Sequence, residues 1–335
     1  MNANKHGFIK NLLRHETILF AVLVAEWIYF DAVGHNFGTY DNSCDILRHS
    51  CEIGLLALAM TPVILTGGID LSVGSLLGLC AILFGKFWRD AGMPIPLAAA
   101  CTIGIGALAG GLNASLIAWL RLPPLIVTLG TYSLFRGLAE AITQGVDTFT
   151  NFPASFLSLG QNRWLGVPAQ APIFLAAAVF FWLLVHRTTF GRSFRAIGFS
   201  PEGAHYAGIP VGRRVAMVYV LAGIVSAIAA IIYTARLGQA KADAGTGYEL
   251  FAITAVVLGG TSIFGGTGSI HGTLLGVAAI AVLHSGIAHA LLPGEMAGML
   301  TGVLLILALA GSTLPKMISG LRTRKSAPRL AKQIP

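Results

Sequence analysis

Long apolar stretches alternate with short polar segments along most of the chain. A bilayer core of about 30 Å is crossed by roughly 20 mostly apolar residues in a helix, and stretches of about this kind follow one another closely. The pattern predicts an all-α, polytopic membrane protein with about ten transmembrane helices, at residues 17–35, 50–66, 71–88, 94–120, 123–144, 171–186, 213–235, 249–264, 269–291 and 295–312.

Two of these stretches are interrupted by glycines. Residues 63–78 read VILTGGIDLSVGSLLG and residues 256–276 read VVLGGTSIFGGTGSIHGTLLG, so each passes from an apolar helix through Gly-Gly and a polar turn into another apolar helix. Interrupted helices line pathways in transporters, whereas a single glycine also serves close helix packing. We predict two broken-helix elements that form a pathway or gate. The residues assigned to it are Gly67, Gly68, Asp70, Ser72, Gly259, Gly260, Thr261, Ser262, Gly265 and Gly266.

Charged residues inside the predicted spans are few. Asp70 follows the first Gly-Gly pair and precedes a helix, so it is either an N-cap or a direct gate or substrate contact. Arg136 and Glu140 are four residues apart on one predicted helix, which predicts that they pair. Three histidines of the ninth predicted span are interpreted as packing or pore-lining residues: His271, His284 and His289.

Composition and the distribution of charge support a membrane location. Hydrophobic residues make up 55% of the chain and charged residues 11%, with a mean hydropathy of +0.75, far from the roughly 25% charged residues of soluble domains. The net charge is +8, but 15 of the 22 Lys and Arg fall in segments on one predicted side. This is the positive-inside pattern. It predicts that both termini are cytoplasmic, agrees with an even number of crossings, and argues against nucleic-acid binding.

The longest predicted cytoplasmic loop, residues 187–214, contains signals for a short helix. Ser200 suits the N-cap, Pro201 the first helical position, and Gly208 the position after the helix end. These signals predict about two turns, from Pro201 to Ala207. A helix this short is marginal alone, so it either packs against its own membrane domain or docks into a groove on a cytoplasmic partner.

Other chemistry is not indicated by the sequence. No GxxxxGK[ST] motif occurs, so the chain is not expected to bind ATP itself. The four cysteines have no CxxC spacing, which gives no support for a disulfide framework or a zinc site. We expect no cofactor, no metal and no catalytic set, and energy for transport must come from elsewhere.

The stretches GGIDLSVGS (residues 67–75), GTGYELFAITAVVLGGTSIFGGTGSIHGTLLG (residues 245–276) and FGRSFRAIGFSPEGAHYAGI (residues 190–209) resemble the permease subunits of ribose-type ATP-binding-cassette importers. The resemblance covers roughly residues 45–312. It implies a dimeric pore with a second permease copy or a related permease, a separate ATPase, a periplasmic sugar-binding protein, and a bacterial inner membrane location. Within that family the similarity fits ribose, rhamnose or autoinducer-2 systems without choosing among them.

The resemblance also implies roles for particular segments. Residues 187–214 become the coupling loop that binds the ATPase, although Glu202 and Gly203 stand where family members usually have an Ala pair. The residues assigned to this loop are Arg192, Arg195, Ser200, Pro201, Glu202, Gly203, Ala204, His205, Tyr206, Ala207 and Gly208. External loops at residues 35–50, 146–170 and 238–249 are the candidate docking surface for the binding protein.

We therefore expect three parts and one transport function. The parts are a cytoplasmic N-terminal segment (residues 1–16), the transmembrane permease domain (17–312) and a basic cytoplasmic tail (313–335). The expected function is inward transport of a monosaccharide or a related polyol-like solute, driven by a separate ATPase. The alternatives are a secondary carrier or channel that works without an ATPase, and an intramembrane enzyme, for which no converging catalytic residues are visible.

Overall fold

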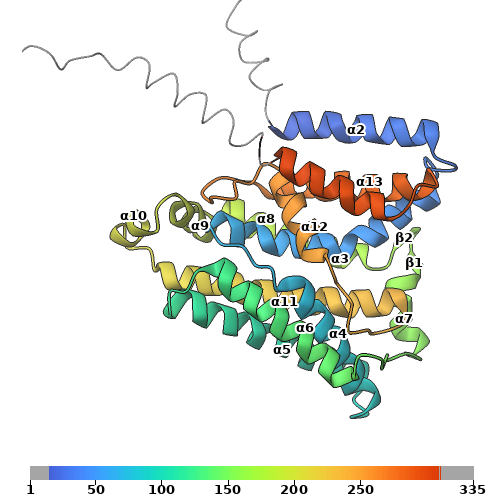
Figure 1. The fold of residues 1–335 in the computed structure, drawn as a ribbon, viewed down its shortest axis with the longest axis horizontal. Helices are drawn as coiled ribbons and strands as arrows, with labels where there is room; N and C mark the ends of the chain where they lie inside the picture. The colour runs from blue at the N-terminus through green and yellow to red at the C-terminus, as the bar shows by residue number, and fades with distance from the viewer. Residues whose placement is uncertain (1–14, 309, 311–335) are drawn as a thin grey trace, which may run out of the picture.

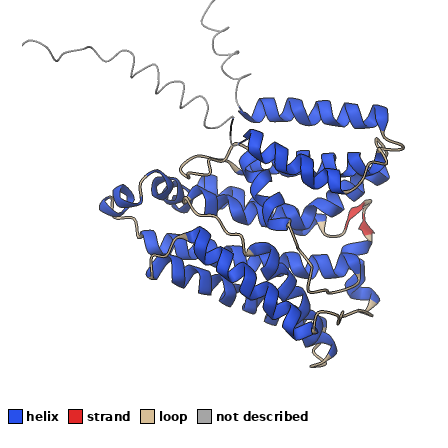
Figure 2. Cartoon of the chain, viewed as in Figure 1, coloured by secondary structure: helices blue, strands red, loops and turns tan. Residues whose placement is uncertain are grey.

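The computed structural model of the chain describes residues 15–308 and residue 310, and it is almost entirely helical (Figure 2). A helix also covers Glu295–Ala308. The named elements in chain order are α2 (His15–Val33), α3 (Tyr40–Leu65), α4 (Val73–Arg89), α5 (Ile95–Ala114), η1 (Ser115–Trp119), α6 (Pro124–Thr143), α7 (Ala154–Gln161), β1 (Arg163–Trp164), β2 (Val167–Pro168), α8 (Ala171–Trp182), η2 (Leu183–Arg187), α9 (Thr189–Phe199), α10 (Pro201–Tyr206), α11 (Val211–Leu237), α12 (Tyr248–Leu258) and α13 (Ile270–His289).

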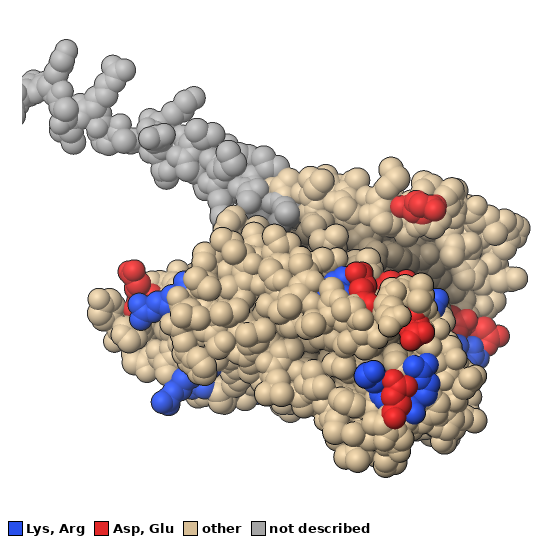
Figure 3. All heavy atoms as spheres, turned by 60° about the horizontal axis from the view of Figure 1, so that its bottom comes forward, with Lys and Arg blue, Asp and Glu red and all other residues tan. Residues whose placement is uncertain are grey.

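The protein has the character of a polytopic membrane protein. Among the described residues, five helices are long and apolar enough to cross a bilayer: α3, α5 with η1, α6, α11 and α13. A sixth span is present if α8 with η2 and α9, which meet at a bend of 68°, are counted together. On the face shown in Figure 3, charged side chains lie toward two opposite ends, and a band without them lies between. Such a band suits contact with lipid.

Helix α11 lies in the middle of the bundle and packs against α5, α3, α4 and α7 (Figure 1). Its contact with α5 is a backbone-to-backbone approach, because a Cβ added to Gly223 would lie 2.1 Å from the carbonyl oxygen of Gly106. Small residues permit this kind of close packing between membrane helices. On the other side of α3, helices α12, α13 and α2 complete the structure. The short α9 and α10 lie together at one end, and α7 and the β1–β2 hairpin lie at the other (Figure 1).

Each of the ten predicted spans contains a helix, but two boundaries were wrong. Helix α3 begins at Tyr40, ten residues before the predicted start, so most of the predicted external loop at residues 35–50 is helical. The early turns of α3 are polar, and hydropathy alone assigned them to a loop. Helix α12 ends at Leu258, six residues before the predicted end, because the glycines that follow leave the helix. The basic tail at residues 313–335 lies outside the described residues, as does most of the segment 1–16.

The predicted pair between Arg136 and Glu140 was also wrong. Nη1 of Arg136 donates instead to the carbonyl oxygens of Ala242 and Ala244, the latter over 3.1 Å. The loop before α12 therefore folds against α6 and α4. Its backbone carbonyls are removed from water there and need donors, and the guanidinium group provides them.

Candidate functional site

The first predicted break lies between the end of α3 at Leu65 and the start of α4 at Val73. Gly67 adopts a φ of +83°, which a residue with a side chain rarely does. The carboxylate of Asp70 is buried, and its Oδ1 accepts from the backbone N of Ser72 over 2.9 Å and from its Oγ over 2.6 Å. Oγ of Ser72 in turn accepts from Nδ2 of Asn113 over 2.8 Å. Asp70 thus satisfies one backbone N–H in the turn before α4, whereas the N-cap residue of α4 is Ser72, whose side chain makes no capping hydrogen bond.

This geometry predicts different results for two substitutions at Asp70. Asp70→Asn keeps an oxygen that can accept from Ser72, so we expect little loss of stability. Asp70→Ala removes it and leaves the buried N–H of Ser72 without its acceptor, which costs about 1–3 kcal/mol. The measurement is the apparent melting temperature of the purified protein, together with solute uptake by cells. Uptake lost equally in the Asn and Ala variants, at normal stability, would instead assign the negative charge a direct role in transport.

The second predicted break separates α12, which ends at Leu258, from α13, which begins at Ile270. Ser269 is the N-cap of α13, and its Oγ accepts from the backbone N of Gly272 over 3.0 Å. Gly272 also lies against Gly259, where an added Cβ would be 1.9 Å from the carbonyl oxygen of Gly259. Close packing therefore explains Gly259, while Gly260 carries a φ of +87° and lies against the ring of His15.

The other residues of the second break form a tight loop. The backbone N of Ser262 donates to the carbonyl oxygen of Thr267 over 2.9 Å, and the N of Gly265 donates to the carbonyl oxygen of Ser262 over 2.9 Å. The side chain of Thr261 is buried against Gly268. Gly265 and Gly266 have φ values of +86° and +80°. The loop is thus shaped by its own backbone hydrogen bonds and by glycines in the left-handed region.

The two breaks are in contact with each other. The backbone N of Gly266 donates to the carbonyl oxygen of Leu65 over 3.0 Å. An added Cβ on Gly265 would lie 2.9 Å from the backbone N of Gly67. The structure therefore brings Gly67, Gly265 and Gly266 together, whereas Gly259 and Gly260 face α13 and α2. Segments about 200 residues apart in sequence thus share one junction.

The short helix predicted from Pro201 to Ala207 is confirmed as α10 (Pro201–Tyr206). Oγ of Ser200 accepts from the backbone N of Gly203 over 3.0 Å, which is the predicted N-cap. At the other end Gly208 has a φ of +79°, and the backbone N of Ile209 donates to the carbonyl oxygen of Ala204 over 3.0 Å. Ala204 is the only residue of α10 that is buried. The other residues of α10 are exposed.

Sequence reasoning missed α9, the helix between η2 and α10. Its buried residues are Gly191, Ser193, Phe194 and Ile197. These residues are spaced so that they share one face of a helix, and Thr188 before them is a suitable N-cap. The two features together could have predicted α9 from the sequence. Arg192 is exposed on this helix. Arg195 was assigned to the coupling loop, but its guanidinium group faces inward to the carbonyl oxygens of Val185 and Gly268, each at 3.4 Å.

One residue of α9 touches both breaks. A Cβ added to Gly198 would lie 2.1 Å from the carbonyl oxygen of Leu65 and 2.3 Å from the backbone N of Gly266. These are the two atoms of the hydrogen bond that joins the breaks. Any displacement of α9 must therefore move the backbone at the junction of the two breaks, because backbones packed at this distance leave no free space between them.

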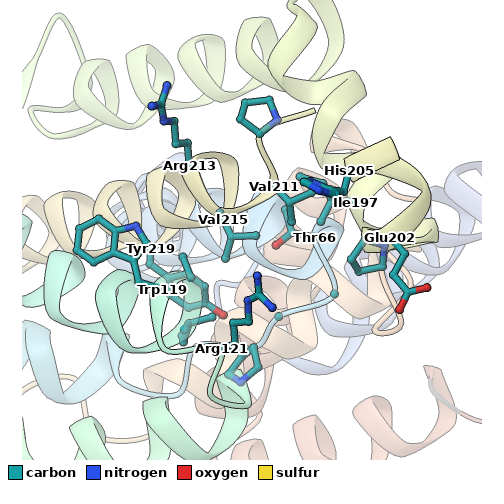
Figure 4. A pocket seen from close by; sticks show the side chains of 18 of the residues that line it. Thr66, Trp119, Arg121, Ile197, Glu202, His205, Val211, Arg213, Val215 and Tyr219 are labelled. Carbon is teal, nitrogen blue, oxygen red and sulfur yellow. The ribbon is translucent and has the colours of Figure 1, made fainter. Parts of the chain in front are cut away.

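A cavity of about 880 Å³ lies between the first break and α10 (Figure 4). Figure 4 shows Trp119 and Tyr219 on one side of it and Glu202 and His205 on the other, with Arg121 below. Tyr219 is fully buried, and its hydroxyl has no hydrogen-bond partner among the described residues. The cavity connects the exposed helix to the glycines of the first break. Sequence reasoning did not single out Tyr219, although it is an isolated hydroxyl in an otherwise apolar part of α11.

Comparison with known proteins agrees with this architecture. Residues 42–309 match the family model described as the permease component of a branched-chain amino acid transport system. The chain is 39% identical over 309 residues to the autoinducer 2 import system permease protein LsrD of Escherichia coli strain K12, with 88% of this chain and 91% of the relative covered. The same figures apply to LsrD of Shigella flexneri and of Escherichia coli O157:H7. No solved structure matches the chain.

A match over most of the chain and a relative at 39% identity show the family. The chain is a transport subunit and not an enzyme, and ATP hydrolysis in these importers resides in a separate subunit. The protein therefore belongs to the family of ATP-binding-cassette importer permeases of the branched-chain amino acid and monosaccharide type, multi-pass proteins of the bacterial inner membrane.

Proposed function

We propose that this chain is the permease through which a small, neutral, sugar-like solute enters the cell, with autoinducer 2, the solute in the names of its relatives, as the first candidate. The observation that carries the proposal is the contact of Gly198 with both breaks. It links the exposed α10, a surface suited to a partner ATPase, to the junction where a pathway would open or close.

The proposed topology has ten crossings with both termini in the cytoplasm. It divides the chain into the N-terminal segment 1–16, the permease domain 17–312 and the basic tail 313–335. Helices at all ten predicted positions support it, as does the gathering of 15 of the 22 Lys and Arg in the segments assigned to the cytoplasm. Helix α12 and the helix Glu295–Ala308 are short for a full crossing, and in this proposal the segments that follow α12 complete its span.

The proposed partners bind at opposite ends of the bundle. The ATPase docks on α10 and the exposed side of α9 within residues 187–214, at the end where Figure 1 shows both helices projecting. The periplasmic binding protein docks at the other end, on the loops at residues 146–170 and 238–249, close to α7 and the β1–β2 hairpin. A second permease, either another copy or a related chain, completes the pathway.

In the proposed mechanism, movement of the ATPase is transmitted to the two breaks through α10 and α9. ATP-driven movement of the ATPase displaces α10, and α9 moves with it because the two helices are in contact. Displacement of Gly198 breaks the hydrogen bond between Gly266 and Leu65 and separates the two breaks. The cavity beside Tyr219 then connects the pathway to the cytoplasm. Rigid packing makes such an element bistable, so a small shift produces a discrete opening.

The proposal predicts that an ATPase co-purifies with the tagged chain from native membranes and that α10 holds it. Tyr206 is 89% exposed as a residue, and an exposed aromatic residue is a typical hot spot when it is buried by a partner. Loss of about 2 kcal/mol in Tyr206→Ala would weaken the complex about thirtyfold. Mass spectrometry of the purified sample identifies the ATPase and measures how much remains bound.

The matched control is Leu165→Ala, because Leu165 is fully exposed in the turn between β1 and β2 at the other end. This variant should retain the ATPase. If the wild-type chain is purified alone in every mild detergent and still transports solute in liposomes that contain no ATPase, the secondary-carrier alternative replaces the importer proposal.

A further inference from the structure

A second cavity, of about 420 Å³, lies among α3, the end of α11, the start of α12 and α13. This volume falls within the range of about 300–1,000 Å³ typical of small-molecule sites. Its lining mixes polar and aromatic side chains, which is unusual for a space between membrane helices. The residues that concern the argument are Asp45, His49, Tyr248, Phe251, His284 and His289.

This cavity lies at the opposite end from α10. Arg236, which lines it, is 25 residues beyond Val211, where α11 begins next to α10. At 1.5 Å per residue the two positions are about 37 Å apart along the helix. In the proposed topology the cavity therefore belongs to the external half of the protein, where a solute would arrive.

Hydrogen-bond partners assign the proton positions on two of the histidines. The guanidinium group of Arg236 only donates, so Nδ1 of His49, 3.0 Å from it, is an acceptor and Nε2 carries the proton. In His289, Nδ1 lies 2.9 Å from the carbonyl oxygen of Ser285 and must donate to it, which leaves Nε2 as an acceptor. One ring thus offers a donor and the other an acceptor.

The third histidine follows the same logic. Oγ1 of Thr301 uses its proton on the carbonyl oxygen of Ala297 over 2.7 Å. It therefore accepts from Nε2 of His284 over 3.4 Å, and Nδ1 of His284 is left as an acceptor. Of the three imidazole rings that line the cavity, one thus keeps a donor nitrogen and two keep an acceptor nitrogen for which the structure shows no hydrogen bond among the described residues. Hydroxyl groups, which both donate and accept, match such a mixed set.

The charges around the cavity are balanced. Arg236 pairs with the buried Glu52 over 2.7 Å, and Asp45 pairs with Arg48 over 3.1 Å. A cation or an anion would find its counter-charge already occupied, so the site suits a neutral molecule. Phe251, whose ring meets that of His284 edge-on at 4.9 Å between centroids, adds an apolar face for the carbon skeleton of a solute.

We infer that this cavity is an external binding site for a neutral polyhydroxy solute of monosaccharide size. The inference rests on the proposed function and extends it, because it assigns the solute a first position inside the permease before the two breaks open. Solute released from the binding protein occupies the cavity, held by hydroxyl contacts to the three histidines.

The test is protection of a cysteine placed in the cavity. Ser285→Cys is introduced into the chain in its native host, and membranes are treated with a membrane-impermeant thiol reagent from the external side. D-ribose is the probe, with autoinducer 2 in a parallel series, and whole cells are first tested for uptake of both. At about ten times the half-protecting concentration, mass action predicts labelling about tenfold slower. Thr150→Cys, exposed outside the cavity, is the control and should not be protected.

A second variant tests the histidines directly. His284→Ala should raise the half-protecting concentration about tenfold, which corresponds to one lost hydrogen bond. His35→Ala, an exposed histidine outside the cavity lining, should leave it unchanged. If the cells take up a solute but neither solute slows the labelling of Ser285→Cys, the site is overturned and the proposed function stays intact. An unreactive cysteine at position 285 also overturns it. If cells take up neither solute, the proposed solute class fails and the site fails with it.

Discussion

Gly198→Ala is expected to abolish uptake while leaving the ATPase bound. The added methyl group would lie 2.1 Å from the carbonyl oxygen of Leu65 and 2.3 Å from the backbone N of Gly266. Both neighbours are backbone atoms and cannot turn aside, so α9 must move away or the hydrogen bond between the breaks must open. Overpacking of this kind costs about 1–3 kcal/mol. Uptake should fall at least about tenfold, because a change of 1.4 kcal/mol in the free-energy difference between two conformations of the transporter changes their ratio by a factor of ten.

Three measurements separate a transport defect from a folding defect. Whole-cell uptake is compared with the amount of protein in the membrane and with the amount of ATPase that co-purifies. Gly302→Ala is the matched control, because an added Cβ there meets nothing within 4 Å, and alanine is favoured over glycine in a helix. Normal uptake by the Gly198→Ala protein would show that the contact between α9 and the breaks does not transmit the movement of the ATPase.

The helices of this protein could be predicted from the sequence because hydropathy reports directly on contact with lipid. The α10 helix could be predicted for a different reason: Ser200, Pro201 and Gly208 are local signals that act within a few residues. The early start of α3 could not. Its first turns carry Asp45 and His49, which line a cavity inside the protein, and a polar lining and a polar loop have the same hydropathy.

The junction of the two breaks required tertiary information. The glycine pattern indicated that both segments leave the helix, but not that Gly266 would donate to Leu65 or that Gly198 would lie between them. The same holds for Arg136, whose nearest acid in sequence is Glu140. Its actual partners are backbone carbonyls of a loop more than 100 residues later. Local spacing predicts a pair only when nothing else competes for the donor.

One buried ion pair joins two charged residues that lie far apart in the sequence. Nε of Arg236 donates to Oε1 of Glu52 over 2.7 Å, and this pair joins α11 to α3. Glu52 is fully buried, and the side chain of Arg236 is 10% exposed. The second oxygen of Glu52 has no partner among the described residues. Removal of the arginine would therefore leave a fully buried carboxylate without its counter-charge.

We expect Arg236→Met to destabilise the protein by about 3–5 kcal/mol, the usual cost of breaking a buried ion pair from one side. Glu52→Leu should be similarly harmful, because it leaves the guanidinium group unpaired. The double variant should be close to the wild type, since replacing both partners by apolar side chains is often neutral. Apparent melting temperatures of the four purified proteins in the same mild detergent measure the cycle.

The exposed pair of Lys86 and Asp90 provides the comparison. These side chains approach to 3.4 Å but are 48% and 37% exposed, and pairs in water contribute about 0–1 kcal/mol. Lys86→Met should therefore barely change the melting temperature. Two results would contradict this role of the ion pair between α11 and α3. One is a melting temperature of Arg236→Met that is as little changed as that of Lys86→Met. The other is a double variant whose loss of stability equals the sum of the losses in the two single variants. In the expected case the recovery in the double variant shows that Arg236 and Glu52 act as a unit.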